Sequence, residues 1–247
     1  MLEIIGLLMT GFWLLMIYDC VRNEPERQTW LWILLFVNVP GALIYFLARW
    51  IYRNNIPLPN YFSRWTRKRE LWLAQAEAKN IGKAHQYVIL GNLLTDMGIF
   101  DQAEVAYQQA LEKEPNHPQA LWGAALIDIK NKKFVPAKEY LQTLLKIEPD
   151  YKYGDASLVY GQTLFNLQEL DQAKAHLEIH LKNWSHPEGY ITLAKTLAQQ
   201  GETQAASNYL ETMITKIRGS SYYHYKRNSH FIHQGEKLIK NLNKIKV

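Results

Sequence analysis

The stretch YVILGNLLTDMGIFDQAEVAYQQALEKEP, residues 87–115, decides the fold of this chain. Its apolar residues recur at helical spacing on either side of MGIFD, which has the composition of a turn. Gly91 and Ala103 are small residues that allow the helices before and after this turn to approach closely. Pro115 ends the second helix because proline cannot continue it. The stretch therefore predicts two helices packed as a pair.

The same pattern returns along the chain with a period of 34 residues, apart from a two-residue insertion at residues 151–153. The small residues at matching positions are Gly91, Ala125, Gly161 and Ala194 in the first helices and Ala103, Ala137, Ala173 and Ala206 in the second helices. This pattern resembles the tetratricopeptide repeat (TPR) family, in which helix pairs stack into a solenoid. Asp128 and His180 depart from the family's usual residue types. We predict an all-α protein with an α-solenoid of about four TPR units at residues 84–220.

The N-terminal region has the composition of a membrane segment. Residues 30–48, WLWILLFVNVPGALIYFLA, contain no charge and are flanked by aromatic residues, as in a bilayer-spanning helix. Residues 2–18 form a shorter apolar stretch that contains Glu3. We therefore predict a transmembrane hairpin of two spans at residues 1–52, with a tolerable kink at Pro40 in the second span.

Residues 12–49 resemble the two-helix module that precedes the catalytic part of phospholipase D-type cardiolipin synthases. The resemblance depends on the tryptophans of the second span and on Gly41, Tyr45, Phe46 and Leu47. It implies an anchor and no lipid chemistry, because that superfamily uses a His-x-Lys-x4-Asp motif. The chain's His224 and Lys226 are followed by Phe231 where the motif has its aspartate.

Charge is distributed unevenly along the chain, although 28 Lys and Arg against 23 Asp and Glu give a net charge of only +5. The residues just after the second span are strongly basic, and the loop at residues 19–29 contains two arginines. The positive-inside rule then places residues 53–247 and the N-terminus in the cytoplasm. Within the linker and lead-in helix at residues 53–83, we expect the membrane surface to attract Arg64, Arg67, Lys68 and Arg69. A basic capping helix is predicted at residues 221–247, and nucleic-acid binding is not expected.

The concave face of a TPR solenoid is lined by the first helix of each pair and binds proteins or peptides. The candidate groove residues at these positions are Asn92, Trp122, Leu126, Phe165, Ile191 and Lys195. They favour an apolar protein segment as the ligand, and the alternative is that Trp122 and Phe165 only pack inside the superhelix. The residues of the chaperone-binding carboxylate clamp are replaced, except for Asn92, so recognition of a chaperone C-terminus is not expected.

Neither an enzyme nor a metal site is predicted. Cys20 is the single cysteine, which excludes an intramolecular disulfide and a cysteine-based zinc site. The pair His176 and His180 and the pair His230 and His233 lack a partner motif for metal binding, so we expect structural roles. No cofactor is expected.

The sequence thus indicates a membrane-anchored scaffold or assembly factor with a cytoplasmic TPR groove, which binds protein partners through the groove and lipids through the hairpin and the basic flank. The arrangement resembles proteins common in cyanobacteria, which would allow the plasma membrane or the thylakoid membrane. A non-catalytic accessory of cardiolipin-type phospholipid metabolism is the main alternative. A soluble RNA-associated factor is a weaker one.

Overall fold

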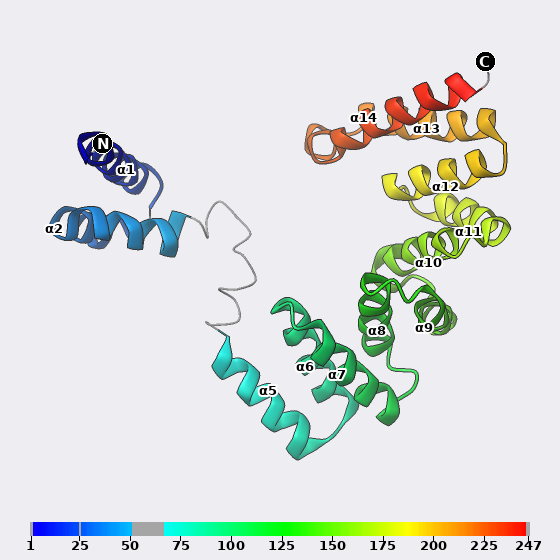
Figure 1. Ribbon diagram of the computed structural model, residues 1–247, viewed down its shortest axis with the longest axis horizontal. Helices are drawn as coiled ribbons and strands as arrows, with labels where there is room; N and C mark the ends of the chain where they lie inside the picture. The colour runs from blue at the N-terminus through cyan, green and yellow to red at the C-terminus, as the bar shows by residue number, and fades with distance from the viewer. Residues whose placement is uncertain (1, 25, 51–66, 246–247) are drawn as a thin grey trace. The chain divides into compact units, whose positions relative to one another are not determined.

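The structure is a computed structural model that describes residues 2–24, 26–50 and 67–245, with side chains from residue 6 to residue 243 (Figure 1). These residues are helical almost throughout, and no strand occurs among them. The chain divides into two compact units, Met1–Phe62 and Ser63–Val247. The prediction of an all-α protein is confirmed.

The second unit is a solenoid of helix pairs that succeed one another along an arc (Figure 1). It begins with α5 (Lys68–Ile81) and ends with α14 (Tyr222–Ile245). The four pairs between them are α6 (Ala84–Asp96) with α7 (Phe100–Lys113), α8 (Pro118–Lys130) with α9 (Phe134–Ile147), α10 (Asp155–Asn166) with α11 (Leu170–Asn183), and α12 (Pro187–Gln199) with α13 (Thr203–Arg218). This is the TPR-like solenoid predicted from the 34-residue period.

Small residues provide the close contacts between these helices. The ring of Tyr107 fills the space beside Gly91, where an added Cβ would lie 2.7 Å from Cε1 of the tyrosine. The same ring fills the space beside Gly123 of the next repeat. Leu177 occupies the equivalent space at Gly161, and Ala103 is completely buried. Because packed interiors leave few voids, larger residues at these positions would push the helices apart.

The two helices of each pair are joined by a turn with a residue in the left-handed backbone region. These residues are Gly98 (φ 73°), Lys132 (φ 60°), Gln168 (φ 61°) and Gly201 (φ 83°). Glycine adopts this conformation at little cost, whereas lysine and glutamine do not. The turn geometry is therefore repeated in all four pairs, although the residue type is not.

The insertion at residues 151–153 forms a short 3-10 turn, η2 (Tyr151–Gly154). Lys152, Tyr153 and Gly154 all have positive φ, at 49°, 56° and 90°. Gly154 also lies against the ring of Trp184, because a Cβ added there would be 2.5 Å from that ring. The insertion thus reverses the chain direction and restores the repeat frame for α10.

Helix α14 covers the end of the solenoid. Ile232 and Leu242 are buried in the same cluster as Met213 and Ile214 of α13. Gly235 allows the close approach, since a Cβ added there would lie 2.9 Å from the Met213 methyl group. The apolar spacing that predicts a capping helix thus corresponds to a helix packed on the last pair.

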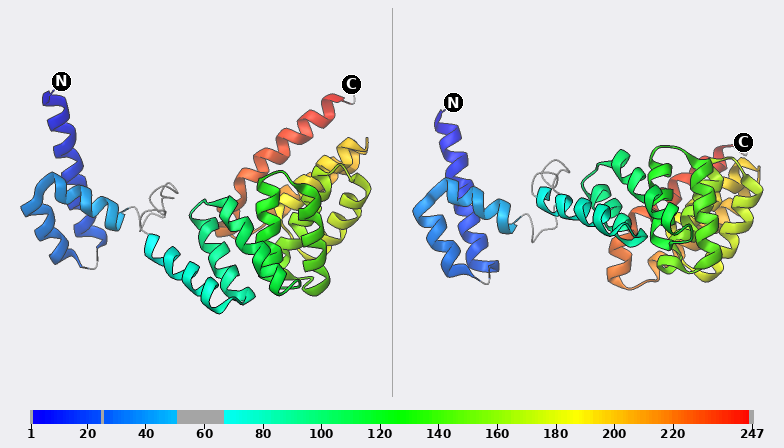
Figure 2. Two further views of the ribbon diagram at one scale, coloured as in Figure 1. Left: turned by 60° about the horizontal axis from the view of Figure 1, so that its bottom comes forward. Right: turned by 90° about the horizontal axis from the view of Figure 1, so that it is seen from below.

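The first unit contains α1 (Leu2–Asn23), α2 (Arg27–Tyr45) and a short π-helix, η1 (Phe46–Trp50). Among the residues that the structure describes, Arg27–Trp50 is the one stretch with the length and composition of a membrane span. This stretch is not a straight helix, because Asn38 has φ 53° and ψ −127° and the chain changes direction there (Figure 2). Two complete spans are therefore not what the structure contains: Asn38 and Pro40 interrupt the helical hydrogen bonds and divide the second predicted span into two short helices.

Candidate functional site

The candidate site is the inner side of the arc. In Figure 1, α8 and α10 follow the inner edge, whereas α9 and α11 lie outside them. The candidate groove residues come from the first helices of the pairs: Asn92 from α6, Trp122 and Leu126 from α8, Phe165 from α10, and Ile191 and Lys195 from α12. The candidate residues thus come from the first helices of four successive repeats.

The candidate residues Asn92 and Trp122, from the first two repeats, make contacts with other residues of the chain. Asn92 accepts a hydrogen bond from the Tyr107 hydroxyl at 2.8 Å. The ring of Trp122 lies 5.8 Å from that of Tyr151, and the Lys152 ammonium lies 5.3 Å from the same indole. The insertion therefore covers part of Trp122 and leaves it half-buried.

The remaining candidates differ in their exposure. Leu126 is 37% exposed, Phe165 is half-buried and Lys195 is exposed. Ile191 is only 7% exposed and belongs to the apolar cluster between α12, α13 and α14. The structure therefore places Ile191 in the core, where it offers little surface to a ligand. Trp122, Leu126 and Phe165 are the apolar candidates that keep accessible surface.

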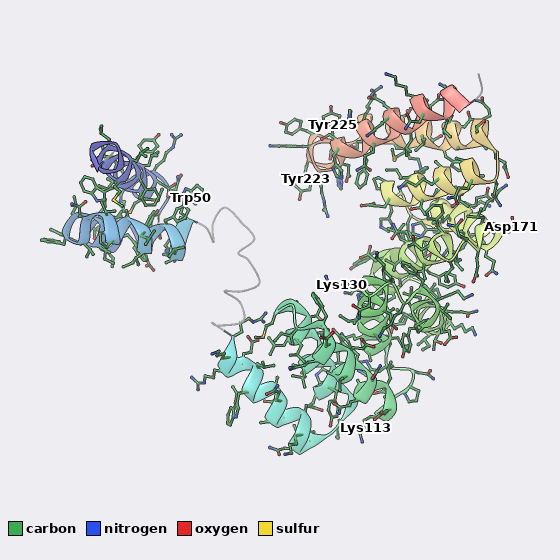
Figure 3. The ribbon with its side chains drawn as sticks, in the orientation of Figure 1. Trp50, Lys113, Lys130, Asp171, Tyr223 and Tyr225 are labelled. Carbon is green, nitrogen blue, oxygen red and sulfur yellow. The ribbon has the colours of Figure 1, made fainter. Side chains whose placement is uncertain are left out.

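A polar hollow of about 500 Å³ lies at the other end of the inner side. Asp155 of α10 and Glu188 of α12 line it together with His224, Arg227 and His230 from the first turns of α14. Tyr223 and Tyr225, labelled in Figure 3, project from the same turns and are exposed. This hollow presents both acidic and basic groups, so it differs in chemistry from the apolar part of the groove.

Beneath this hollow, histidines form a continuous hydrogen-bonded chain. His176 Nε2 lies 2.9 Å from the Ser157 carbonyl oxygen, which can only accept, so this nitrogen is the donor. The Ser157 hydroxyl is 3.0 Å from His180 Nδ1, and His180 Nε2 is 3.1 Å from His186 Nδ1. His186 Nε2 in turn lies 3.8 Å from an Asp155 oxygen. This arrangement gives both ring nitrogens of His180 a hydrogen-bond partner.

Burial controls the protonation of His180 and His176. The His180 side chain is completely buried. That burial, with repulsion from His186 and His176, lowers the pKa of His180 from its usual 6.5 to about 4. Burial also lowers the pKa of His176, against the opposing effect of its hydrogen bond to the Ser157 backbone. These two histidines are therefore neutral at physiological pH and act as packed hydrogen-bonding groups, which accords with the structural role predicted for them.

The basic residues before the solenoid are not equivalent. Arg67 donates to Glu70 at 2.7 Å and also to Asp96 of α6 at 3.3 Å, so its charge is used within the chain. Lys68 and Arg69 are exposed on the first turn of α5. The fourth predicted residue, Arg64, lies outside the described residues. Lys68 and Arg69 are thus the described members of this set whose charges face solvent.

The residues that the sequence offers as candidates for catalysis or metal binding do not form such a group in the described part of the chain. His224 and Lys226 are exposed on α14, and Phe231 is half-buried. No three residues among His, Cys, Asp and Glu are arranged to hold a metal ion within the described residues. The polar hollow could not be predicted from the sequence, because its residues come from three helices that are far apart in the chain.

The chain matches two protein families over part of its length. Residues 94–155 match the family described as "Tetratricopeptide repeat", and residues 11–50 match "Phospholipase_D-nuclease N-terminal". No curated protein matches the chain. Neither match bears on a cyanobacterial origin, which stays a prediction.

Several solved structures resemble the solenoid. One MamA structure, labelled AMB-1, has 16% identity and a TM-score of 0.57, and the alignment covers 66% of this chain and 90% of that one. MamA from Desulfovibrio magneticus RS-1 has 14% identity and a TM-score of 0.57, with 66% and 97% covered. YrrB has 20% identity and a TM-score of 0.52, with 68% and 90% covered. At such low identity, these likenesses show the fold alone.

Proposed function

Because the chain is a tetratricopeptide repeat protein with a phospholipase D-nuclease N-terminal segment, we propose that it is a membrane-anchored scaffold or assembly factor. In this function, the N-terminal unit holds the chain at a membrane, and the inner side of the solenoid binds an apolar segment of a protein partner. The solenoid is cytoplasmic, and the membrane is the plasma membrane or the thylakoid membrane.

The observation that carries the binding proposal is the partial exposure of apolar side chains on the inner side. Trp122 and Leu126 from one repeat and Phe165 from the next keep accessible surface, although the first helices otherwise bury most of their apolar residues. Aromatic side chains in such positions commonly provide most of the binding energy of a protein interface. YrrB, which has the same fold, is described as a TPR protein with an unusual peptide-binding site.

The membrane proposal is supported by the apolar surface of the first unit. Large apolar side chains are exposed there without cover from the chain, including Leu7, Leu8, Leu15, Phe36 and Val37. A surface of this kind is costly in water and is typical of a membrane contact. The exposed charges of Lys68 and Arg69, close after this unit in sequence, would favour a surface of anionic lipids.

Partner capture tests the groove. We expect Trp122→Ala with Phe165→Ala to abolish recovery of partners from detergent-solubilised membranes, because each truncated anchor at an interface typically costs about 2 kcal/mol or more. Val135→Ala with Ile179→Ala, which shortens exposed residues on the outer helices α9 and α11, is the matched control and should retain the partners. Both variants should keep the wild-type helicity and membrane location.

Two outcomes would contradict the groove assignment. If the double alanine variant retained its partners, the inner side would not be the binding surface. If that variant unfolded while the outer control did not, Trp122 and Phe165 would be core residues.

The match of residues 11–50 favours a second candidate, a non-catalytic accessory of phospholipid metabolism. This candidate predicts that deletion of the gene changes the cardiolipin or phosphatidylglycerol content of the membrane. It also predicts that the double alanine variant restores this content, since the groove would have no part in the function. The scaffold proposal predicts unchanged bulk lipid composition.

A further inference from the structure

The two halves of Arg27–Trp50 lie against each other. An added Cβ at Gly41 would be only 2.6 Å from the carbonyl oxygen of Ile33. The rings of Trp30 and Tyr45 are 5.5 Å apart between centroids. In a straight helix, these two residues would be separated by about 22 Å, given a rise of 1.5 Å per residue. The chain therefore reverses at Asn38 and returns toward its starting point.

The reversal brings several polar side chains of the first unit together at one end. Arg49 donates to Glu24 at 2.6 Å and to Glu26 at 3.3 Å. The Tyr45 hydroxyl donates to Asp19 at 2.9 Å. Trp50, labelled in Figure 3, is the last residue of the second half of Arg27–Trp50. A straight helix over Arg27–Trp50, with 24 residues, would separate its ends by about 36 Å, and Glu26 could not reach Arg49.

The opposite end is mostly apolar, apart from the exposed Asn38 at the bend. Leu8, Met9 and Phe12 of α1 face Val39, Pro40 and Leu43 around a hollow of about 410 Å³. The residues just before the bend, Phe36 and Val37, are exposed. A hollow lined in this way fits the hydrocarbon chains of lipids, because it offers almost no polar group to water.

Helix α1 supplies a hydrogen bond near the point where the helix over Arg27–Trp50 is interrupted. The bend at Asn38 interrupts the regular hydrogen bonding of the preceding turn, and Trp13 Nε1 donates to the Leu34 carbonyl oxygen at 2.7 Å. Irregular backbone within a bilayer requires such protein partners, since lipid tails offer no hydrogen bonds. The bent conformation is therefore compatible with immersion in lipid.

The helix lengths differ in a way that decides which helix can cross. α1 has 22 residues, and its apolar part at residues 2–18 is about 25 Å long, which a locally thinned hydrocarbon core can accommodate. Each half of Arg27–Trp50 contains about half of its 24 residues and is about 18 Å long. Neither half reaches across the core.

From these observations, we propose that the first unit crosses the bilayer once: α1 is the crossing helix, and Arg27–Trp50 enters the lipid and returns on the same side. This inference rests on the membrane anchor proposed above and replaces the two-span topology predicted from the sequence. The connection between α1 and α2 then lies on the same side as the solenoid. The start of α1 lies on the other side.

The distribution of basic residues is consistent with this topology. None of residues 1–21 is Lys or Arg. The described basic residues that follow, up to the start of α5, are all on the solenoid side in the proposed topology: Arg22, Arg27, Arg49, Arg67, Lys68 and Arg69. The positive-inside rule is then satisfied without exception, whereas two spans would leave Arg22 and Arg27 outside.

Cysteine labelling of the full chain tests the topology. In a Cys20→Ala background, Leu2→Cys, Gln28→Cys and Val247→Cys each supply one thiol, and Gln28 is exposed at the polar end. In right-side-out vesicles, an impermeant maleimide should label Leu2→Cys only. Gln28→Cys and Val247→Cys should react once the vesicles are lysed.

The bend itself is tested by adding Asn38→Leu and Pro40→Leu, which restore a continuous helix. Gln28→Cys should then become reactive in intact vesicles while Val247→Cys stays protected. If the straightened chain kept Gln28→Cys protected, the bend would not determine the topology, and the proposal would fail.

Other results distinguish this inference from the proposed anchor. Suppose that the chain without Asn38→Leu and Pro40→Leu resists alkaline extraction and that its Gln28→Cys is labelled in intact vesicles. This result would overturn the single crossing but leave the membrane anchor. Protection of Leu2→Cys would show that α1 does not cross. Release of the chain by alkaline extraction would overturn the anchor and the topology together.

Discussion

His180 illustrates how one residue can depart from a repeat pattern without weakening the fold. The pattern has a small residue at this position, whereas the imidazole of His180 is completely buried. It fits because Ser157 and His186 form hydrogen bonds with its two nitrogens and because the Trp184 ring lies 5.1 Å away between centroids. A buried polar group whose hydrogen bonds are all made costs little, but a charge at the same place would be costly.

The stability of the solenoid should therefore fall in acid. In the unfolded chain, His180 binds a proton near pH 6.5, whereas folding delays this protonation to about pH 4. The contribution of His180 to the free energy of unfolding is thus complete above pH 6.5. It decreases as the pH falls toward 4, by roughly 3 kcal/mol at most. Urea unfolding of residues 63–247 at several pH values measures this decrease.

Two matched variants test whether the loss of stability in acid is due to His180. His180→Asn keeps a group for Ser157 but does not titrate in this range, so it should flatten the pH dependence. His233→Asn, at an exposed histidine of α14, should leave the pH dependence as in the wild type. An equal slope for His180→Asn and the wild type would contradict the assignment, although His176 contributes in the same direction.

At the scale of the element, each helix pair depends on its turn. Gly98, Lys132, Gln168 and Gly201 occupy the same left-handed position in the four pairs. The contacts around the turn are also the same, because a backbone N–H two or three residues after the first helix bonds back to its last carbonyls, as Lys133 does to Asp128 at 2.7 Å. The two non-glycine residues therefore carry a local strain that tertiary packing offsets.

Replacement of the strained residue should stabilise the second pair. We expect Lys132→Gly to raise the free energy of unfolding by about 0.5–1 kcal/mol, because the removed left-handed strain exceeds the added entropy of the unfolded chain. Gly98→Lys, the reciprocal change in the first pair, should lower it by a similar amount. Thermal unfolding of residues 63–247 compares the two, and a loss of stability in Lys132→Gly would contradict the strain argument.

At the scale of the whole molecule, the two units have separate cores. Met16, Cys20, Leu34, Ala42 and Tyr45 form the buried cluster of the first unit. The clusters of the second unit extend from α5 to α14 and include no residue of the first. Each unit thus has a buried cluster of its own, which is the usual condition for independent folding.

Residues 63–247 should therefore fold without the membrane unit. We expect this fragment to be soluble and helical and to unfold cooperatively at the same temperature as the solenoid of the full chain in detergent. Circular dichroism and calorimetry measure both properties. A fragment that is unfolded, or that melts well below the full chain, would show that the first unit stabilises the solenoid.

Much of the solenoid could be predicted from the sequence because its contacts are local. A helix pair of about 34 residues contains both partners of many close contacts, such as Gly91 and Tyr107, so the spacing of small residues already indicates which helices meet. Composition likewise indicated an apolar segment at the N-terminus. The candidate groove residues followed from their positions in the repeat.

The tertiary structure decided the features that depend on residues far apart in the chain. Ile191 belongs to the buried cluster that α12 shares with α13 and α14, and the polar hollow exists because α14 faces α10 and α12. The bend at Asn38 is likewise fixed by contacts from Trp13 of α1 and from Glu24 just after α1. Length and hydropathy describe one segment at a time, so the sequence determined that residues 27–50 are apolar, and only the packing against α1 decided that they turn back.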